Sequence, residues 1–210
     1  MSDILRQVDE DLRKDRLLSI WRSYRVYIAG SILIILIVLS GYQYHLFSTK
    51  TKNEVIVEDY IQAINSTDID ISINRLVELD KSANSYIVGL AKLKRAELYF
   101  TSGKNVQAIN LLKSISSDDS LDQVIRDLAL YKYLMVQLDV IEKDLYFEII
   151  DSQNLSESKF KYLFKELRAL KHLIHGEKIN SLEVFESIIL DENSPMNVKI
   201  RAEKFKKISK

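Results

Sequence analysis

Two of the three histidines are the residues whose spacing most resembles a metal site. His172 and His175 lie three residues apart in a segment with helical periodicity, and Glu177 follows closely. Side chains at this spacing share a helix face, so two imidazoles could in principle bind one metal ion. A structural explanation accounts for the same pattern. His172 occupies an aromatic position of a helical hairpin, and His175 lies in a last helical turn, where positive charge is favoured. We therefore expect no metal ion and no other cofactor.

Two pairs of neighbouring acidic residues could suggest acid–base chemistry, namely Asp118-Asp119 and Asp191-Glu192. Both pairs lie in segments typical of loops, where carboxylates cap helices and stabilise turns. The chain also lacks the motifs of phosphate-binding loops, dinucleotide-binding turns, zinc proteases and serine hydrolases. It contains no cysteine, which excludes a cysteine nucleophile and thiolate zinc sites. These observations predict a protein that is not an enzyme and has no small-molecule substrate.

The charge balance and the scarcity of turn residues limit the possible partners and folds. The 30 Lys and Arg residues are matched by 30 Asp and Glu residues, so no positive excess is present to neutralise phosphates. We expect no binding to nucleic acid. Five glycines and one proline in 210 residues are too few for the frequent turns of an all-β fold. The elements that position any functional side chain must therefore be helices.

The apolar residues are concentrated in one segment near the N-terminus. Residues 26–49 contain no Asp, Glu, Lys or Arg, and Ile32 to Leu39 is an unbroken aliphatic run. About 20 apolar residues in a helix cross a hydrocarbon core of about 30 Å. The alternatives are a buried helix of a soluble core and a cleavable signal peptide, but the long polar stretch before the segment argues against a signal peptide. We predict a transmembrane helix over residues 26–49, flanked by the aromatic residues expected at membrane interfaces: Trp21, Tyr24, Tyr27, Tyr42, Tyr44 and Phe47.

Basic residues near this segment predict its orientation. Five lie before it and two follow closely, which places the N-terminus in the cytoplasm by the positive-inside rule; they are Arg13, Lys14, Arg16, Arg22 and Arg25, then Lys50 and Lys52. Residues 1–25 are predicted to form a cytoplasmic amphipathic segment, and residues 50–210 a domain on the far side, the periplasm of a bacterium.

Helical periodicity dominates residues 50–210 and predicts an all-α domain. Glycines suit the ends of two helices, and Ser194-Pro195 stops another. The helices are expected at Glu54–Ile64, Ile71–Asp80, Ser85–Thr101, Asn105–Ile115, Leu121–Ile141, Leu145–Asp151, Glu157–His175, Ile179–Leu190 and Asn197–Ile208.

Two segments of this domain carry the same arrangement of small, aromatic and glycine residues. In the first, small residues would let two antiparallel helices approach closely and a glycine would make the tight turn between them; its members are Ala96, Tyr99, Gly103, Ala108 and Leu112. The second copy contains Ala169, Gly176 and Phe185. The pattern resembles the tetratricopeptide repeat, which implies an α-solenoid of helical hairpins. Lys92 and Arg95 depart from the repeat pattern, and a generic helical hairpin remains the alternative.

The layout of the whole chain resembles bacterial inner-membrane proteins with a YfgM-like tetratricopeptide domain. The resemblance depends on the N-terminal "MSDILRQVDEDLRKDRL", the single apolar segment, the degenerate repeats and the ending Asp191, Pro195 and Arg201-Ala202. It implies a cytoplasmic N-terminus and a periplasmic domain. It also implies an ancillary subunit of the Sec translocon that works with periplasmic chaperones.

Stacked helical hairpins would present a concave wall lined by the first helix of each pair. The residues expected on this wall are Leu93, Glu97, Phe100, Thr101, Glu166, Leu170 and Leu173. The alternative is that the apolar members pack between repeats. We predict a membrane-anchored adaptor that binds other proteins. The competing hypotheses are a structural organiser of an envelope or division complex that self-associates, and an envelope enzyme with an unrecognised site.

Overall fold

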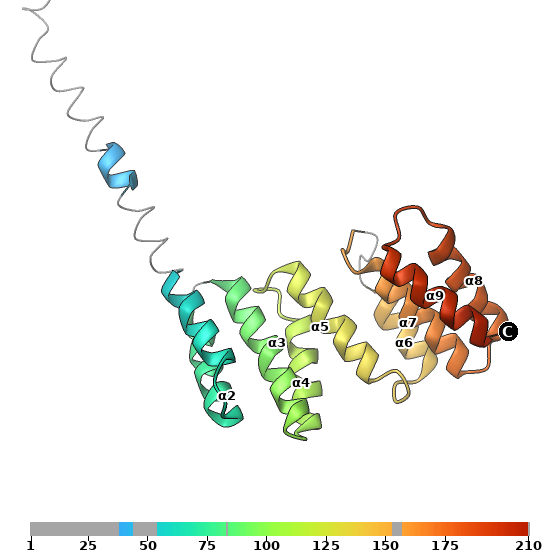
Figure 1. Ribbon diagram of the computed structural model, residues 1–210, viewed down its shortest axis with the longest axis horizontal. Coiled ribbons are helices and arrows are strands. Elements are labelled where there is room, and N and C mark those ends of the chain that lie inside the picture. The colour runs from blue at the N-terminus through green and yellow to red at the C-terminus, as the bar shows by residue number, and fades with distance from the viewer. Residues whose placement is uncertain (1–37, 44–53, 83, 153–156, 210) are drawn as a thin grey trace, which may run out of the picture. The chain divides into compact units, whose positions relative to one another are not determined.

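The computed structural model describes residues 38–43, 54–82, 84–152 and 157–209 (Figure 1). Within these ranges the secondary structure is helical and no strand occurs, so the prediction of an all-α fold is confirmed for this part of the chain. The chain divides into two compact units, Met1–Val55 and Ile56–Lys210. Each unit is described by itself.

The first unit contains the whole segment predicted to cross the membrane, residues 26–49. Its residues 38–43 are helical and exposed, whereas residues 26–37 and 44–49 of that segment lie outside the described part of the chain. The predicted cytoplasmic segment, residues 1–25, also lies outside it. Among the residues that are described, no helix combines the length and the hydropathy needed to cross a bilayer.

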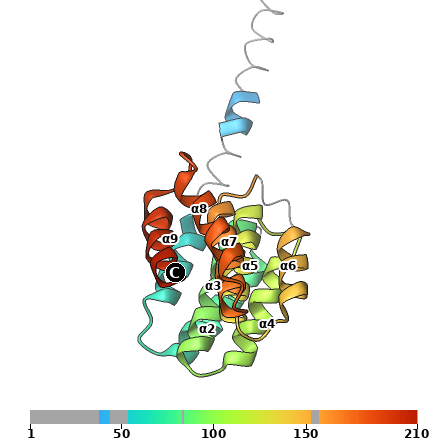
Figure 2. The same ribbon diagram turned by 90° about the vertical axis from the view of Figure 1, so that its right-hand side faces the viewer.

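The second unit is a series of helices that follow one another in chain order (Figure 1), and Figure 2 shows the same helices from an orthogonal direction. Residues 54–64 are helical. The elements that follow are α2 Ile69–Glu78, the 3-10 turn η1 Leu79–Lys81, α3 Ser85–Thr101, α4 Asn105–Ser116, α5 Gln123–Val136, α6 Lys143–Asp151, α7 Lys161–Ile174, α8 Lys178–Leu190 and α9 Met196–Ser209.

Two glycines close the tightest helix turns, as their positions predict. Gly103 follows α3 and Gly176 follows α7, and both have φ of +75°, a backbone region that costs residues with a Cβ about 1–2 kcal/mol. At Gly103 the amide of Lys104 donates to the carbonyl of Tyr99 at 2.8 Å, and the glycine amide donates to the next carbonyl at 3.1 Å. This pair of bonds is the Schellman arrangement, which satisfies carbonyls that the helix end leaves unpaired. The same pattern occurs at Gly176.

Side-chain caps fix where several helices begin. The Asp68 carboxylate accepts the amides of Asp70 and Ile71 at the start of α2, and Asn84 accepts an amide at the start of α3. Asp122 accepts the amide of Val124 and begins α5. A side-chain oxygen at this position satisfies a backbone N–H that has no partner within the helix.

The hydrophobic core is a series of four clusters rather than one centre. The first joins helix 54–64 to α2 and α3, the second joins α3, α4 and α5, the third joins α5, α6 and α7, and the fourth joins α7, α8 and α9. Each cluster therefore connects helices that are close in sequence.

A bidentate ion pair also joins α7 to α9. Arg201 of α9 donates two hydrogen bonds, of 2.8 and 2.6 Å, to the buried carboxylate of Glu166 on α7.

Two helix boundaries differ by four residues or more from those that periodicity predicts, and the others differ by at most two. α2 begins at Ile69 rather than Ile71, because the Asp68 cap fixes its start. α5 ends at Val136 rather than Ile141, and α7 begins at Lys161 rather than Glu157. α5 and α7 are shorter than predicted, and they lie directly before and after α6 in the chain. The residues that the prediction had included in them form connections, and polar groups of these connections bind side chains from other helices.

Candidate functional site

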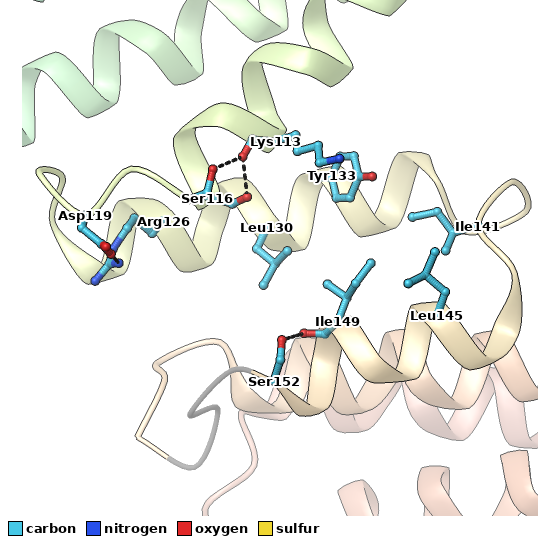
Figure 3. A pocket seen from close by; sticks show the side chains of 11 residues that line it. Lys113, Ser116, Asp119, Arg126, Leu130, Tyr133, Ile141, Leu145, Ile149 and Ser152 are labelled. Carbon is cyan, nitrogen blue, oxygen red and sulfur yellow. Dashed lines mark hydrogen bonds and ion pairs between the residues drawn. The ribbon is translucent and has the colours of Figure 1, made fainter.

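A groove runs between α5 and α6, with the end of α4 at its rim (Figure 3). One wall carries Arg126, Leu130 and Tyr133 of α5, and the other carries Leu145, Ile149 and Ser152 of α6. Both rows have helical spacings of four and three residues, so each row lies along one face of its helix. Figure 3 shows the aliphatic side chains of both walls pointing into the space between the helices. The groove has a volume of about 570 Å³.

The side chain of Tyr146 on α6 belongs to the core cluster that joins α5, α6 and α7. It is fully buried, and its hydroxyl donates a hydrogen bond of 3.1 Å to the carbonyl of Leu134 on α5. Burial raises the pKa of Tyr146, so its hydroxyl stays protonated and able to donate. Both helices pack on Phe164 and Leu167 of α7, whereas their own backbones barely approach each other. The two helices are therefore joined through Tyr146 and through their shared neighbours on α7.

A buried lysine fixes the connection between α5 and α6. Lys171 of α7 is 1% exposed, and its ammonium group donates to the carbonyls of Leu138, at 2.7 Å, and of Ile141. The ammonium group also lies 5.1 Å from the centre of the Tyr146 ring. Burial lowers the pKa of Lys171, since the charged form loses contact with water. Lys171 thus replaces water as the partner of two carbonyls that follow the end of α5.

The connection between α6 and α7 is fixed to α5 by a buried carboxylate. The Ser158 hydroxyl donates to Asp127 of α5 at 2.5 Å, and the Gln123 side-chain amide donates to the other carboxylate oxygen at 2.5 Å. Asp127 is 4% exposed. A buried carboxylate is stable when its oxygens accept hydrogen bonds, so these donors determine where α7 can begin.

The beginning of α6 is fixed to the turn between α7 and α8. Lys143 donates a hydrogen bond to Glu177, and Nδ1 of His172 lies 2.6 Å from the other oxygen of that carboxylate. The Lys143 hydrogen bond, followed by the His172 contact, lowers the pKa of Glu177 to about 2. His172 also packs against the ring of Phe147, with centroids 4.7 Å apart, while His175 is exposed. Within the described ranges no three His, Cys, Asp or Glu residues are grouped to hold a metal ion.

The rim of the groove carries its charged and hydroxyl groups. Arg126 pairs with Asp119, and the hydroxyls of Ser116 and Ser117 donate to the carbonyl of Lys113 at 2.8 and 3.1 Å. The ammonium group of Lys113 has no carboxylate partner within the part of the chain that the structure describes. The lining thus contains two cations and one carboxylate.

Most of the residues predicted to pack the repeats are buried in the second unit. Ala96 and Leu112 belong to the cluster of α3, α4 and α5, and Ala108 is fully buried. Ala169 and Phe185 belong to the cluster of α7, α8 and α9. Tyr99 is half-buried.

The residues predicted to line a concave wall are not brought together by the structure. Their apolar members are divided between clusters: Leu93 is buried and Phe100 packs beside it in the second cluster, whereas Leu170 packs in the fourth. Glu166 is 4% exposed and bound by Arg201. The placement of Leu93 and Glu166 on an open wall is therefore corrected, because core packing and an ion pair occupy them.

The remaining predicted wall residues are partly or fully accessible on α3 and α7. Glu97 is exposed and forms an ion pair with Lys94 at 2.7 Å, and Thr101 is exposed, with its hydroxyl bonded to the carbonyl of Glu97. Leu173 is half-buried. Glu97 and Thr101 thus bind partners on their own helix, so this part of α3 does not present a cluster of unsatisfied polar groups.

The α5–α6 groove was missed at the sequence level because its hairpin lacks the repeat signature. One signal could have indicated it. In α6, apolar residues occupy positions 145, 146, 147, 149 and 150, a wide apolar side of the helix. Tyr146 and Ile150 are buried in the core and Ile149 packs against it, which leaves Leu145 exposed at one edge of this apolar side. An apolar side wider than the core covers is expected to leave an exposed contact surface.

Comparison of the chain with models of known protein families, with curated proteins and with solved structures found no match. The interpretation of the groove therefore depends on its own geometry and chemistry.

Proposed function

We propose that the chain is a membrane-anchored adaptor that binds other proteins through the α5–α6 groove. In this proposal, residues 26–49 cross the bacterial inner membrane once, with the N-terminus in the cytoplasm and the helical unit in the periplasm. The proposal is supported most directly by the groove itself. Its lining includes the exposed Leu145, the half-buried Ile149 and the buried Leu130, and buried hydrogen bonds fix the helices around it.

The proposal includes a tetratricopeptide-like solenoid as the architecture of the helical unit. Three observations support it. Helices that are neighbours in sequence pack against each other, and their cores form a series. Two tight turns use glycine in the left-handed conformation. Ala96 and Ala108 are buried on the hairpin of α3 and α4, where small side chains permit close packing.

The chemistry of the groove favours binding over catalysis. The apolar part of its lining consists mainly of aliphatic side chains, which bury apolar groups of a partner and activate no reacting atom. Two polar groups of the rim, Arg126 and Asp119, bind each other. A groove with apolar side chains inside and a polar rim is typical of a protein-interaction site. The tether would add to its affinity by holding the groove near other membrane proteins.

Site-specific photo-crosslinking in intact membranes tests this function. A photoreactive amino acid replaces Leu145 in the groove, which is 50% exposed, or Val106 on α4, which is 72% exposed and does not line the groove. We expect the Leu145 position to capture specific proteins, including components of the translocon or its chaperones, and the Val106 position not to capture them. Equal capture at the two positions would refute the groove as the binding surface. Capture of only a second copy of this chain would favour the structural organiser.

The topology requires a separate test. A reporter enzyme that is active only outside the cytoplasm, fused after Lys210, should be active in living bacteria if the helical unit is periplasmic. Activity of a cytoplasm-specific reporter at the same position would contradict the proposed orientation.

A further inference from the structure

The groove also indicates which kind of polypeptide fits it. Its two rows each extend over seven residue steps, from Arg126 to Tyr133 and from Leu145 to Ser152. Seven steps along a helix rise about 10 Å. An amphipathic helix presents apolar anchors at positions i, i+4 and i+7, which cover the same length.

The other common peptide-binding modes fit these walls poorly. An extended peptide binds by adding to the exposed edge of a sheet, and both walls here are helices whose backbone groups are bonded within the helix. A polyproline segment needs a groove lined by several aromatic rings. The lining of this groove contains one aromatic residue, Tyr133, while Leu130, Leu145 and Ile149 are aliphatic.

The charge of the lining selects among amphipathic helices. Lys113 and Arg126 lie on the wall formed by α4 and α5, and the α6 wall contributes no charged residue to the lining. Asp119 pairs with Arg126, which leaves the ammonium group of Lys113 as the excess charge. Acidic side chains on the flank of a partner helix that faces α4 and α5 would therefore complement the charge of the groove.

We propose that the α5–α6 groove receives an acidic amphipathic helix of a partner protein. Its apolar ridge contacts Leu145 and Ile149, and its acidic flank faces Lys113. The proposal rests on the proposed function, since it specifies the segment that the adaptor would bind. The hydrogen bonds of Tyr146 and Lys171 fix α6 and the α5–α6 connection within the helical unit, so both walls exist without the partner.

Binding of designed helical peptides to the full-length chain in nanodiscs tests the proposal. Three fluorescent 14-residue peptides serve as probes, with empty nanodiscs as the baseline. The first has leucines at i, i+4 and i+7 and glutamates on one flank. The second replaces the glutamates by lysines. The third has the composition of the first with the leucines distributed around the helix. Fluorescence anisotropy gives the affinity of each.

We expect the first peptide to bind about tenfold more tightly than the second and the third. Leu145→Asp should weaken its binding by about tenfold or more, because the substitution places a charge in the apolar lining. Lys113→Glu should reverse the preference between the first and second peptides. Val106→Asp is the matched control: both residues lie in the first turn of a helix, where an aspartate is tolerated, so this variant should bind like the wild type.

Equal binding of the first two peptides, or binding that Leu145→Asp leaves unchanged, would overturn the proposal. Preference for an uncharged apolar small molecule over all three peptides would overturn it too. These failures are distinguishable from failure of the proposed function. Photo-crosslinking from Leu145 that still captures partners through other kinds of segment retains the adaptor, whereas capture that is equal at Val106 removes it.

Discussion

The buried Lys171 provides the sharpest test of how the connection between α5 and α6 is fixed. Substitution by methionine keeps an unbranched side chain of similar length on α7 and removes only the ammonium group. The carbonyls of Leu138 and Ile141 then lose their donor. Since both belong to the connection between α5 and α6, the effect should be concentrated there and not spread over the helical unit.

The expected magnitude follows from two opposing contributions. Hydrogen bonds from a charged donor contribute about 1.5–3 kcal/mol each, so two of them contribute about 3–6 kcal/mol. Burial of an ammonium group is itself unfavourable, as the lowered pKa of Lys171 indicates, and methionine relieves that cost. We expect Lys171→Met to lower the free energy of unfolding by about 2 kcal/mol, within the range seen when a buried donor is removed.

Two measurements on the full-length chain check this expectation. Denaturant unfolding followed by circular dichroism gives the loss of stability, and hydrogen exchange shows where it occurs. Amides of residues 137–146 should exchange faster, while those of α8 and α9 should not. Lys178→Met is the control, because Lys178 is exposed, and it should change stability by less than about 0.5 kcal/mol. A Lys171→Met variant as stable as the wild type, or faster exchange throughout the unit, would refute the role given to Lys171.

Three further perturbations test the packing, the turns and an ion pair. Gly89→Ala would place a Cβ 2.6 Å from Cγ2 of Ile125. The cost of overpacking, about 1–3 kcal/mol, should exceed the gain in helix propensity of about 1 kcal/mol, so the variant should be less stable than the wild type. In denaturant unfolding, the double variant with Ile125→Ala should lose less stability than the sum of the two single variants. Gly103→Ala meets no neighbouring atom but retains φ of +75°, so its loss of about 1 kcal/mol should not be rescued by truncating any neighbour. Glu177→Gln should destabilise the chain at neutral pH. Since the Lys143 hydrogen bond lowers the folded pKa of Glu177 to about 2, the difference from wild type should be complete above about pH 4.5 and disappear as the pH falls towards 2; a difference that persists unchanged in acid would contradict the ion pair.

Local rules in the sequence predicted much of the helical architecture. The bounds of α3, Ser85–Thr101, agree at both ends, and Gly103 and Gly176 have the predicted backbone conformation. These features depend on a few neighbouring residues: a cap at the start and a glycine at the end. The end of α5 could not be predicted in this way, because residues 137–141 continue the helical pattern. Their carbonyls bind Lys171, which lies 30 or more residues away in the chain.

The candidate site was less predictable than the fold. Leu93 and Glu166 were placed on a binding wall by analogy with stacked repeats, and the structure buries both. The sequence does not distinguish an apolar side chain in a core from one in an open groove, because both follow the same helical spacing. Glu166 is buried because Arg201, 35 residues later, supplies a bidentate partner. Leu145 and Ile149 follow the same spacing, and Leu145 remains exposed while Ile149 is half-buried.

The sequence by itself determined that this part of the chain forms short amphipathic helices joined by tight turns, since periodicity, caps and glycines act over a few residues. It also contains the long apolar segment on which the predicted membrane anchor depends. Only the tertiary structure decided which apolar faces were covered. On α6, Tyr146 and Ile150 are covered by α5 and α7, whereas Leu145 remains exposed beside α5. Whether a face is open depends on contacts between distant helices, and no local pattern encodes that distance.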